Sequence, residues 1–85
     1  MIKKVYKEIL SKLGDLNIDF KVTNHNENYI TIETEDTINW AFDGILMFNI
    51  IELEFDGDIL SITFNCSLLY HNIDEEFIRN MEWEY

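Results

Sequence analysis

Apolar and polar residues alternate along three runs between Ile38 and Tyr70, which is the pattern of strands that bury one face of a sheet. The runs are separated by Asp43-Gly44 and by Asp56-Gly57-Asp58, and both separators contain residues that favour tight hairpin turns. We therefore expect an antiparallel meander of three strands in this part of the chain.

The two turns also predict the register of the meander. A two-residue turn at Asp43-Gly44 gives three pairs on one side of the sheet: Phe42 with Ile45, Trp40 with Met47 and Ile38 with Asn49. A turn at Gly57-Asp58 gives four pairs: Phe55 with Leu60, Leu53 with Ile62, Ile51 with Phe64 and Met47 with Leu68. Both hairpins select the same apolar face, and a slip of one residue would turn that face outward.

Two further strands are predicted before the meander, at Leu16–Thr23 and Tyr29–Thr34, because apolar residues again occupy alternate positions. The loop 24–28 consists mostly of turn-forming residues. It sets the following pairs: Val22 with Ile30 and Phe20 with Ile32. A turn at Glu35-Asp36-Thr37 would place the second strand beside the meander, so that five antiparallel strands follow one another in meander order.

A helix is predicted at each end of this sheet. Over residues 1–13, apolar side chains recur at three- and four-residue steps, and Gly14 is a natural end. After Tyr70 a helical period returns, with Asn72 and Glu75 spaced as in a capping box. The sequence thus predicts an α+β fold: an N-terminal helix, a five-stranded antiparallel meander and a C-terminal helix, in a single domain over residues 1–85.

Composition supports a folded chain that works inside the cell. Leu, Ile, Val and Phe make up 29 of the 85 residues, a share typical of a domain with a core rather than of a disordered chain. No run approaches the roughly 20 apolar residues of a membrane span, and the basic start lacks the features of a signal peptide. The lone Cys66 lies on the inward side of a predicted strand, where we expect a buried thiol. We expect a cytoplasmic protein.

Charge narrows the classes of partner. The net charge is −11, and it is uneven: residues 1–21 hold five lysines and three acids, whereas residues 22–85 hold one arginine and 14 acids. Such a field repels nucleic acids and anionic membranes, and it attracts basic proteins. The alternative is that the acidity serves solubility alone.

The second face of the predicted sheet combines two surfaces that a protein partner would recognise. Its apolar end consists of Leu46, Phe48, Ile50 and Leu69. Its acidic end consists of Glu52, Glu54 and Asp56, beside Ser61 and Thr63. The apolar end would supply affinity and the acidic end would supply steering, unless a terminal helix covers the apolar end.

The acidic row also suggests mimicry of nucleic acid. Side chains on alternate strand positions stand about 6.6–6.8 Å apart, a spacing of the same order as that of successive phosphates. Further acids could extend the row over neighbouring strands and turns: Glu33, Glu35, Asp36 and Asp43. In composition the chain resembles small acidic phage inhibitors of host nucleases and repair enzymes, and also immunity proteins that neutralise basic nuclease toxins. Its abundance of Ile and Asn is that of an AT-rich genome, such as that of a phage of low-GC bacteria, whose product would act in the host cytoplasm.

Catalysis is not indicated. His25 and His71 lack the spacing of a zinc site, and the chain has neither a glycine-rich phosphate loop nor a nucleophile-elbow motif. We expect no enzyme activity, no metal and no cofactor. Trp40 points to the predicted core, whereas Trp83, flanked by acids in the tail, is either a partner contact or part of a tail folded back on the sheet.

These observations favour a non-enzymatic protein that inhibits a basic, nucleic-acid-binding protein, with Glu52, Glu54 and Asp56 as phosphate surrogates. An immunity protein or antitoxin held against a toxin is the alternative within the same class. A structural or assembly subunit is the alternative from another class, and in it the apolar end of the sheet would form a seam between copies of a homodimer.

Overall fold

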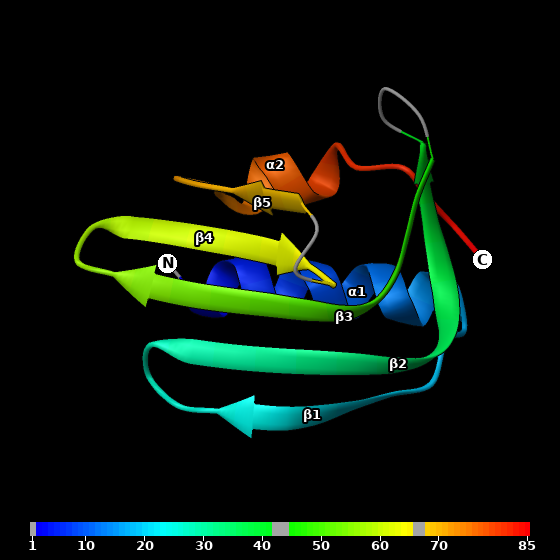
Figure 1. Ribbon diagram of the computed structural model, residues 1–85, viewed down its shortest axis with the longest axis horizontal. Coiled ribbons are helices and arrows are strands. Elements are labelled where there is room, and N and C mark those ends of the chain that lie inside the picture. The colour runs from blue at the N-terminus through cyan, green and yellow to red at the C-terminus, as the bar shows by residue number, and fades with distance from the viewer. Residues whose placement is uncertain (1, 42–44, 66–67) are drawn as a thin grey trace.

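The computed structural model describes residues 2–41, 45–65 and 68–85, and it shows one bent antiparallel sheet with two helices (Figure 1). Along the chain the elements are α1 (Ile2–Asp15), β1 (Phe20–His25), β2 (Tyr29–Ala41), β3 (Ile45–Asp56), β4 (Ile59–Phe64), β5 (Leu68–Tyr70), α2 (Glu75–Arg79) and β6 (Trp83–Glu84). Strands β1 to β5 lie in meander order, and β6 pairs with β2. The predicted α+β fold with a five-stranded meander between two helices is confirmed.

The division of the chain into strands differs from the prediction in two places. The turn expected at Glu35-Asp36-Thr37 is wrong, because β2 runs without a reversal from Tyr29 to Ala41 and is interrupted only by a register shift between Glu33 and Ile38. The long strand expected up to Tyr70 is instead two strands, and β5 turns back to pair with β4. Leu68 therefore lies opposite Phe64, and the predicted contact with Met47 is wrong.

Helix α1 packs on the sheet through Val5, Ile9 and Leu13, which are buried in the same core as the sheet's apolar face. Its end is set by Asn17, whose φ of 56° is left-handed, and not by Gly14 as predicted. The N–H of Asn17 donates to Gly14 O and that of Ile18 donates to Leu13 O, each at 3.1 Å, which is the bonding of a Schellman motif. Because this cap uses residues 16–18, the first strand begins at Phe20 rather than at Leu16.

The β1–β2 hairpin is shifted by two residues from its predicted register. Val22 lies opposite Ile32 and Phe20 lies opposite Thr34, with a bulge between Val22 and Asn24. The shift preserves the side of the sheet to which each residue points, because the side-chain period of a strand is two. All six residues of β1 are nevertheless exposed, since this strand lies at the edge of the sheet.

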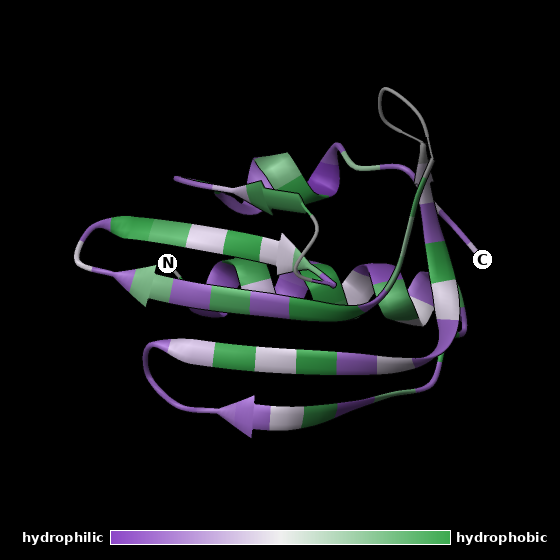
Figure 2. Cartoon of the chain, in the orientation of Figure 1, coloured by the Kyte–Doolittle hydropathy of each residue, from purple (hydrophilic) through white to green (hydrophobic). Residues whose placement is uncertain are grey.

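The β3–β4 hairpin has the predicted register. Phe55 lies opposite Leu60, Leu53 opposite Ile62 and Ile51 opposite Phe64. The turn places Gly57 at φ 62°, a left-handed conformation that glycine adopts without strain at the first central position of a two-residue hairpin turn. Figure 2 shows the resulting alternation of hydrophilic and hydrophobic residues along β2 and β3.

The upper half of β2 and β3 is offset by one residue from the prediction. Trp40 lies opposite Leu46 and Ile38 lies opposite Phe48, instead of Met47 and Asn49. The predicted turn Asp43-Gly44 and the preceding Phe42 lie outside the described part of the chain. Buried positions change parity along β3, because both Phe48 and Ile51 are fully buried. Strand β3 therefore exchanges its two faces between Phe48 and Ile51, and both β2 and β3 bend in Figure 1.

Asn65 holds this bend. Its side-chain Oδ1 accepts hydrogen bonds from the backbone N–H groups of Asn49 (3.1 Å) and Ile50 (2.7 Å). The backbone N–H of Asn65 donates to Ile50 O (3.0 Å). In a regular antiparallel strand successive N–H groups point to opposite edges, so two neighbouring N–H groups can share one acceptor only where the strand is kinked. On the facing strand, the Thr34 hydroxyl donates to Asp36 O (2.7 Å) at the same level.

The bend turns the upper arm of the sheet over the core. Phe48 contacts Phe64 and Trp83, with ring centroids 4.6 and 5.3 Å apart. Trp83 is 7% exposed in β6, which pairs with β2 at Asn39 and Trp40. The tail is thus folded back on the sheet, and Trp40 is buried as predicted.

The N-cap of the C-terminal helix lies two residues later than predicted. Asp74 is the N-cap of α2, and its carboxylate accepts a hydrogen bond from the N–H of Phe77 at 2.9 Å. Asn72, the predicted cap, has a left-handed φ of 57° between β5 and the helix. Glu75 and Glu76 do lie in the first turn, where the helix dipole favours acids.

Replacing Phe48 with Ala tests the exchange of faces in β3. Because Phe48 is fully buried against two aromatic rings, its loss should lower the free energy of unfolding by about 3–5 kcal/mol. The exposed neighbour provides the control: Met47→Ala should change it by less than about 0.5 kcal/mol, since Met47 is 61% exposed. Urea unfolding measures both, and the reverse order of effects would refute the register.

Replacing Asn65 with Gly tests the bend. Glycine keeps the left-handed backbone and removes the acceptor for two amides, so we expect a loss of about 1–3 kcal/mol in urea unfolding. Asn65→Asp keeps the acceptor and should cost less. Equal stability of the wild type and Asn65→Gly would show that the bend does not depend on this side chain.

Candidate protein-binding face

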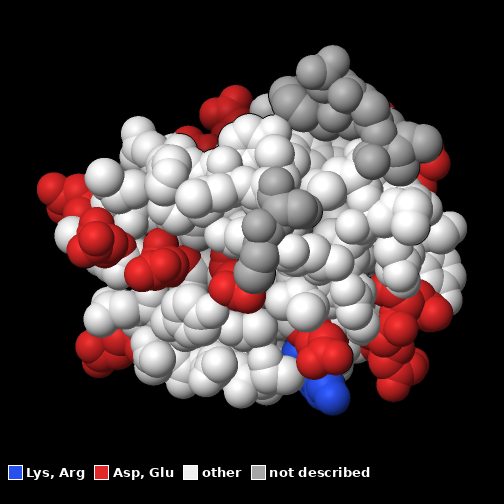
Figure 3. Space-filling model, in the orientation of Figure 1, with Lys and Arg blue, Asp and Glu red and all other residues white. Residues whose placement is uncertain are grey.

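The face of the sheet opposite the helices, here called the outer face, is the side toward the viewer in Figures 1 and 3. Helix α1 lies behind the sheet in this view, and its buried residues belong to the core on the far side. By strand pairing, the outer face carries Lys21, Tyr29, Thr31, Glu33, Ile50, Glu52, Glu54, Asp56, Ile59, Ser61, Thr63 and Leu69. Acidic side chains are spread over it in Figure 3, whereas basic side chains are visible only near its lower edge.

The predicted acidic row lies on β3 at the centre of this face. Glu54 and Asp56 are exposed, and Glu52 is half-buried. Glu52 lies between Thr31 and Thr63 on the adjacent strands. Glu54 lies between Tyr29 and Ser61. Hydroxyl-bearing side chains therefore flank both glutamates, and the placement of Ser61 and Thr63 beside the row agrees with the sequence prediction.

Tyr29 orients the first carboxylate of the row. Its hydroxyl donates a hydrogen bond to Glu52 Oε2 at 2.7 Å, diagonally across the two strands. This hydrogen bond to a carboxylate, with smaller contributions from desolvation and from the charge of Glu54, raises the pKa of Tyr29. Nothing in the sequence pattern distinguished Tyr29 as a site residue, because the contact depends on a diagonal pairing that only the register reveals.

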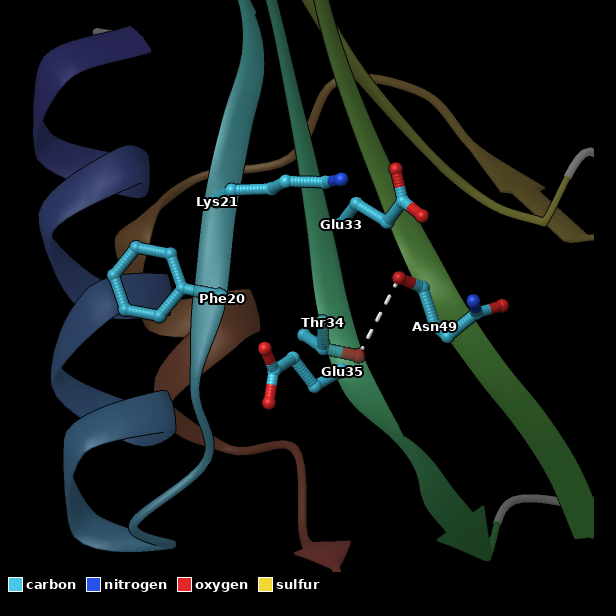
Figure 4. Close-up of a pocket in the computed structure, with 6 residues that line it drawn as sticks. All are labelled: Phe20, Lys21, Glu33, Thr34, Glu35 and Asn49. Atoms are coloured by element: carbon cyan, nitrogen blue, oxygen red, sulfur yellow. Dashed lines mark hydrogen bonds between the residues drawn. The ribbon is translucent and has the colours of Figure 1, made fainter.

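The outer face ends at a small open pocket beside the bend, with a volume of about 210 Å³. Figure 4 shows its lining residues: Phe20, Lys21, Glu33, Thr34, Glu35 and Asn49. Lys21 lies directly opposite Glu33 in the β1–β2 ladder, and both side chains extend over the outer face. The Thr34 hydroxyl lies 3.4 Å from Asn49 O across the floor of the pocket. The basic side chain of Lys21 thus offsets part of the charge at this end, and the next acids of the outer face lie on β3.

The other predicted acids are not all brought to the row. Glu35 and Asp36 are exposed on β2 at the bend. Asp36 accepts a hydrogen bond from the hydroxyl of Tyr85, which ties the end of the chain to this strand and raises the pKa of Tyr85. Asp43 lies outside the described residues. The structure therefore groups Glu33, Glu52, Glu54 and Asp56, and sets Glu35 and Asp36 apart from them.

The predicted apolar end of this face is present only in part, because Ile50 and Leu69 lie on the outer face, opposite Glu33 and Thr63, whereas Phe48 does not. Phe48 and Trp83 are core residues and are not available to a partner. Leu46 is half-buried against the same core. The exposed apolar side chains in this region are Met47 and Leu69, at 61% and 50%. Met47 was expected inside, and its exposure follows from the exchange of faces at the bend.

Basic side chains gather on the helix side. Lys3, Lys4 and Lys7 are exposed on α1. Lys12 donates hydrogen bonds to Arg79 O and Met81 O at the end of α2, and its Nζ lies 5.7 Å from the centre of the Trp83 ring. Burial against these groups lowers the pKa of Lys12 although Glu8 opposes that shift. These lysines lie on the side of the molecule away from the acidic row, beside the acids that α1 and α2 themselves carry.

The two histidines lie apart from the acidic row, and each contacts one neighbouring side chain. The ring of His25 is 5.7 Å from that of Tyr6 on α1, and His71 Nδ1 is 2.9 Å from Ser61 Oγ. Among the described residues, no three His, Cys, Asp or Glu side chains gather in a way that could hold a metal ion. Cys66, the expected buried thiol, lies outside those residues. No described helix is long and apolar enough to cross a membrane.

No protein-family model, curated protein or solved structure matches this chain. Function must therefore be argued from the outer face itself. Its carboxylates can accept hydrogen bonds and pair with cationic side chains, and the flanking hydroxyls can both donate and accept. This chemistry suits recognition of a basic surface.

Titration of Tyr29 tests the contact at the head of the row. Glu52→Gln should lower the pKa of Tyr29 toward its ordinary value, whereas the raised pKa of Tyr85 should stay unchanged because it depends on Asp36. Because the pKa of Tyr29 is higher in the folded protein than in the unfolded chain, its hydrogen bond to Glu52 stabilises the fold fully below the ordinary pKa of tyrosine. This stabilisation is lost as the pH rises through the folded-state pKa. Ring carbon shifts followed by NMR against pH measure both tyrosines, and an unchanged Tyr29 would contradict the contact.

Proposed function

We propose that this chain is a small acidic, non-enzymatic binding protein that inhibits a basic, nucleic-acid-handling protein by presenting carboxylates where phosphates would lie. The observation that supports the proposal is a group of carboxylates on a face of the sheet that no described helix covers. A sheet face that no described helix covers carries Glu33, Glu52, Glu54 and Asp56, while the exposed lysines of α1 lie on the opposite side.

The geometry of the row is suited to a groove that binds a nucleic-acid strand. Glu52, Glu54 and Asp56 alternate on one strand, so their backbone positions are about 6.6–6.8 Å apart and their side chains point the same way. A row of carboxylates on a strand loses less conformational entropy on binding than the same carboxylates on a flexible loop would, because the strand backbone is already ordered. Tyr29 further restrains Glu52.

The chemistry of the row favours a partner rich in arginine and lysine. A net charge of −11 steers basic proteins toward the molecule, and lysines on the helix side orient it so that the outer face leads. A partner whose groove binds phosphates would then be occupied by the row and closed to its own nucleic acid. We infer competition for the groove, not chemistry on the partner, as the mode of inhibition.

Charge removal on the outer face tests this function. The immobilised protein is exposed to a nuclease-treated bacterial lysate at low salt, and bound proteins are eluted with a salt gradient and identified by mass spectrometry. We expect a basic nucleic-acid-binding protein that elutes as salt rises, because surface charge pairs are screened. Its affinity should fall about tenfold or more for Glu52→Gln/Glu54→Gln.

The matched control is Glu76→Gln/Glu82→Gln, which removes the same charge from exposed positions on α2 and in the segment after it. This variant should bind as the wild type does. The glutamine at position 52 can still accept the hydrogen bond from Tyr29, so the first variant changes charge and leaves the fold intact. Equal losses in the two variants, or binding that survives in both, would refute the outer face as the binding surface.

A further inference from the structure

Another pocket lies on the helix side of the sheet, between the first two turns of α1 and the loop that joins β1 to β2. In Figure 1 the start of α1 and this loop lie at the same end of the molecule. The volume of the pocket is about 470 Å³, compared with about 210 Å³ for the pocket beside the bend. Pockets that hold small molecules usually measure about 300–1,000 Å³, so this one is large enough for such a ligand.

Apolar and aromatic side chains make up most of its lining. Ile2 and Tyr6 lie one helical turn apart on α1, and Ile30 on β2 is only 2% exposed. His25 lies opposite Ile30 in the β1–β2 ladder, so its side chain points to the same side of the sheet. The rings of Tyr6 and His25 are 5.7 Å apart and inclined by 37°. Together these side chains offer a planar aromatic group both ring surfaces and aliphatic surfaces to pack on.

Positive charge exceeds negative charge at the rim. The lining contains one cation, Lys3, and one acid, Glu27, and both are exposed. Lys7 lies one helical turn beyond Lys3, and residues 2–7 hold three lysines and no acid, although the whole chain carries −11. Asn26 also lines the pocket, and its Oδ1 accepts the N–H of Asn28 at 2.9 Å, so its side chain can contribute an N–H donor to a ligand.

We propose that this pocket binds a small aromatic carboxylate. The ring of the ligand packs on Tyr6, His25 and Ile30, and its carboxylate pairs with Lys3. A single lysine in the lining suits a ligand with a single negative charge. An aromatic amine would have only Glu27 to pair with and would face the lysines of α1. The proposal does not depend on the proposed function, because the pocket and the acidic row lie on opposite sides of the sheet.

A matched set of small molecules tests the class of ligand. Isotope-labelled protein at neutral pH and physiological ionic strength is titrated with 2-naphthylacetate, and its amide chemical shifts are followed by NMR. A typical ligand efficiency over about 14 non-hydrogen atoms gives a Kd of about 1 mM, and the shifted amides should belong to residues 2–7 and 25–30. The amine 2-(2-naphthyl)ethylamine has the same ring and the opposite charge, whereas acetate lacks the ring. Each should bind at least about fivefold more weakly than 2-naphthylacetate.

This series needs no variant, so it tests the proposal on the native fold. An amine or acetate that binds as tightly as 2-naphthylacetate would overturn the assignment of the ligand. No shift at these residues up to about 10 mM 2-naphthylacetate would overturn the site itself.

Opposite charge changes at the rim test where the carboxylate lies. Lys3→Gln should weaken 2-naphthylacetate about two- to fivefold, which is the range of an exposed ion pair, and Glu27→Gln should tighten it by a similar factor. The matched control is Lys4→Gln, which removes the same charge from an exposed position on the same helix that does not line the pocket. Its Kd should stay within about 1.5-fold of the wild type. Equal losses in Lys3→Gln and Lys4→Gln would show an effect of overall charge and would overturn the contact.

Removal of one ring tests the aromatic part of the pocket. His25 is exposed, so His25→Ala should keep the fold, which the amide spectrum without ligand checks. The variant should bind 2-naphthylacetate about two- to tenfold more weakly, because the ligand loses one of its two ring contacts. Its preference for the acid over the amine should remain, since that preference comes from Lys3. Unchanged binding by a folded His25→Ala variant would contradict the proposed position of the ring.

Discussion

The hydrogen bonds that Asn65 makes to the backbone of residues 49 and 50 determine the shape of this protein. A flat meander of the same strands would place Phe48 on the outer face and leave Trp83 without a cavity. The kink exchanges the two faces of β3, so that Phe48 and Ile51 are both buried although they are three residues apart. The aromatic cluster of Phe48, Phe64 and Trp83, and with it the docking of the tail, depends on that exchange.

The kink also separates the two properties of the outer face that a partner would recognise. Below it, β3 keeps the alternation that sends Glu52, Glu54 and Asp56 outward and Ile51 and Leu53 inward. Above the kink, Phe48 is buried in the core, although a flat sheet would have placed it on the outer face. What remains exposed is a mainly acidic and hydroxyl-bearing surface, and both helices and most lysines lie on the other side. The proposed binding function therefore relies on charge rather than on a large apolar patch.

Sequence reasoning succeeded where local chemistry decides structure. The Gly57 turn, the register of β3 with β4, and the stripe of α1 follow from glycine conformation and from periodicity, and the placement of the acidic row follows from them. It failed where hydrogen bonds to a side chain distant in sequence interrupt the regular pairing of strands. The hydrophobic period of residues 38–50 gives no sign that the Asn65 side chain accepts hydrogen bonds from two adjacent backbone N–H groups. A turn was therefore predicted at Glu35-Asp36-Thr37, where β2 bends, and Phe48 was assigned to the wrong face. Asn17 ended α1 in place of Gly14 for a separate, local reason, since asparagine also tolerates the left-handed region.

We propose that the outer face occupies the site where a partner binds nucleic acid. Competition tests it most directly: the partner captured on the immobilised protein is challenged with duplex DNA, with single-stranded DNA and with a neutral polymer of similar size. The account predicts that at least one nucleic acid releases the partner in proportion to its concentration and that the neutral polymer does not. A partner that stays bound at saturating nucleic acid, and still binds that nucleic acid while held, would contradict mimicry.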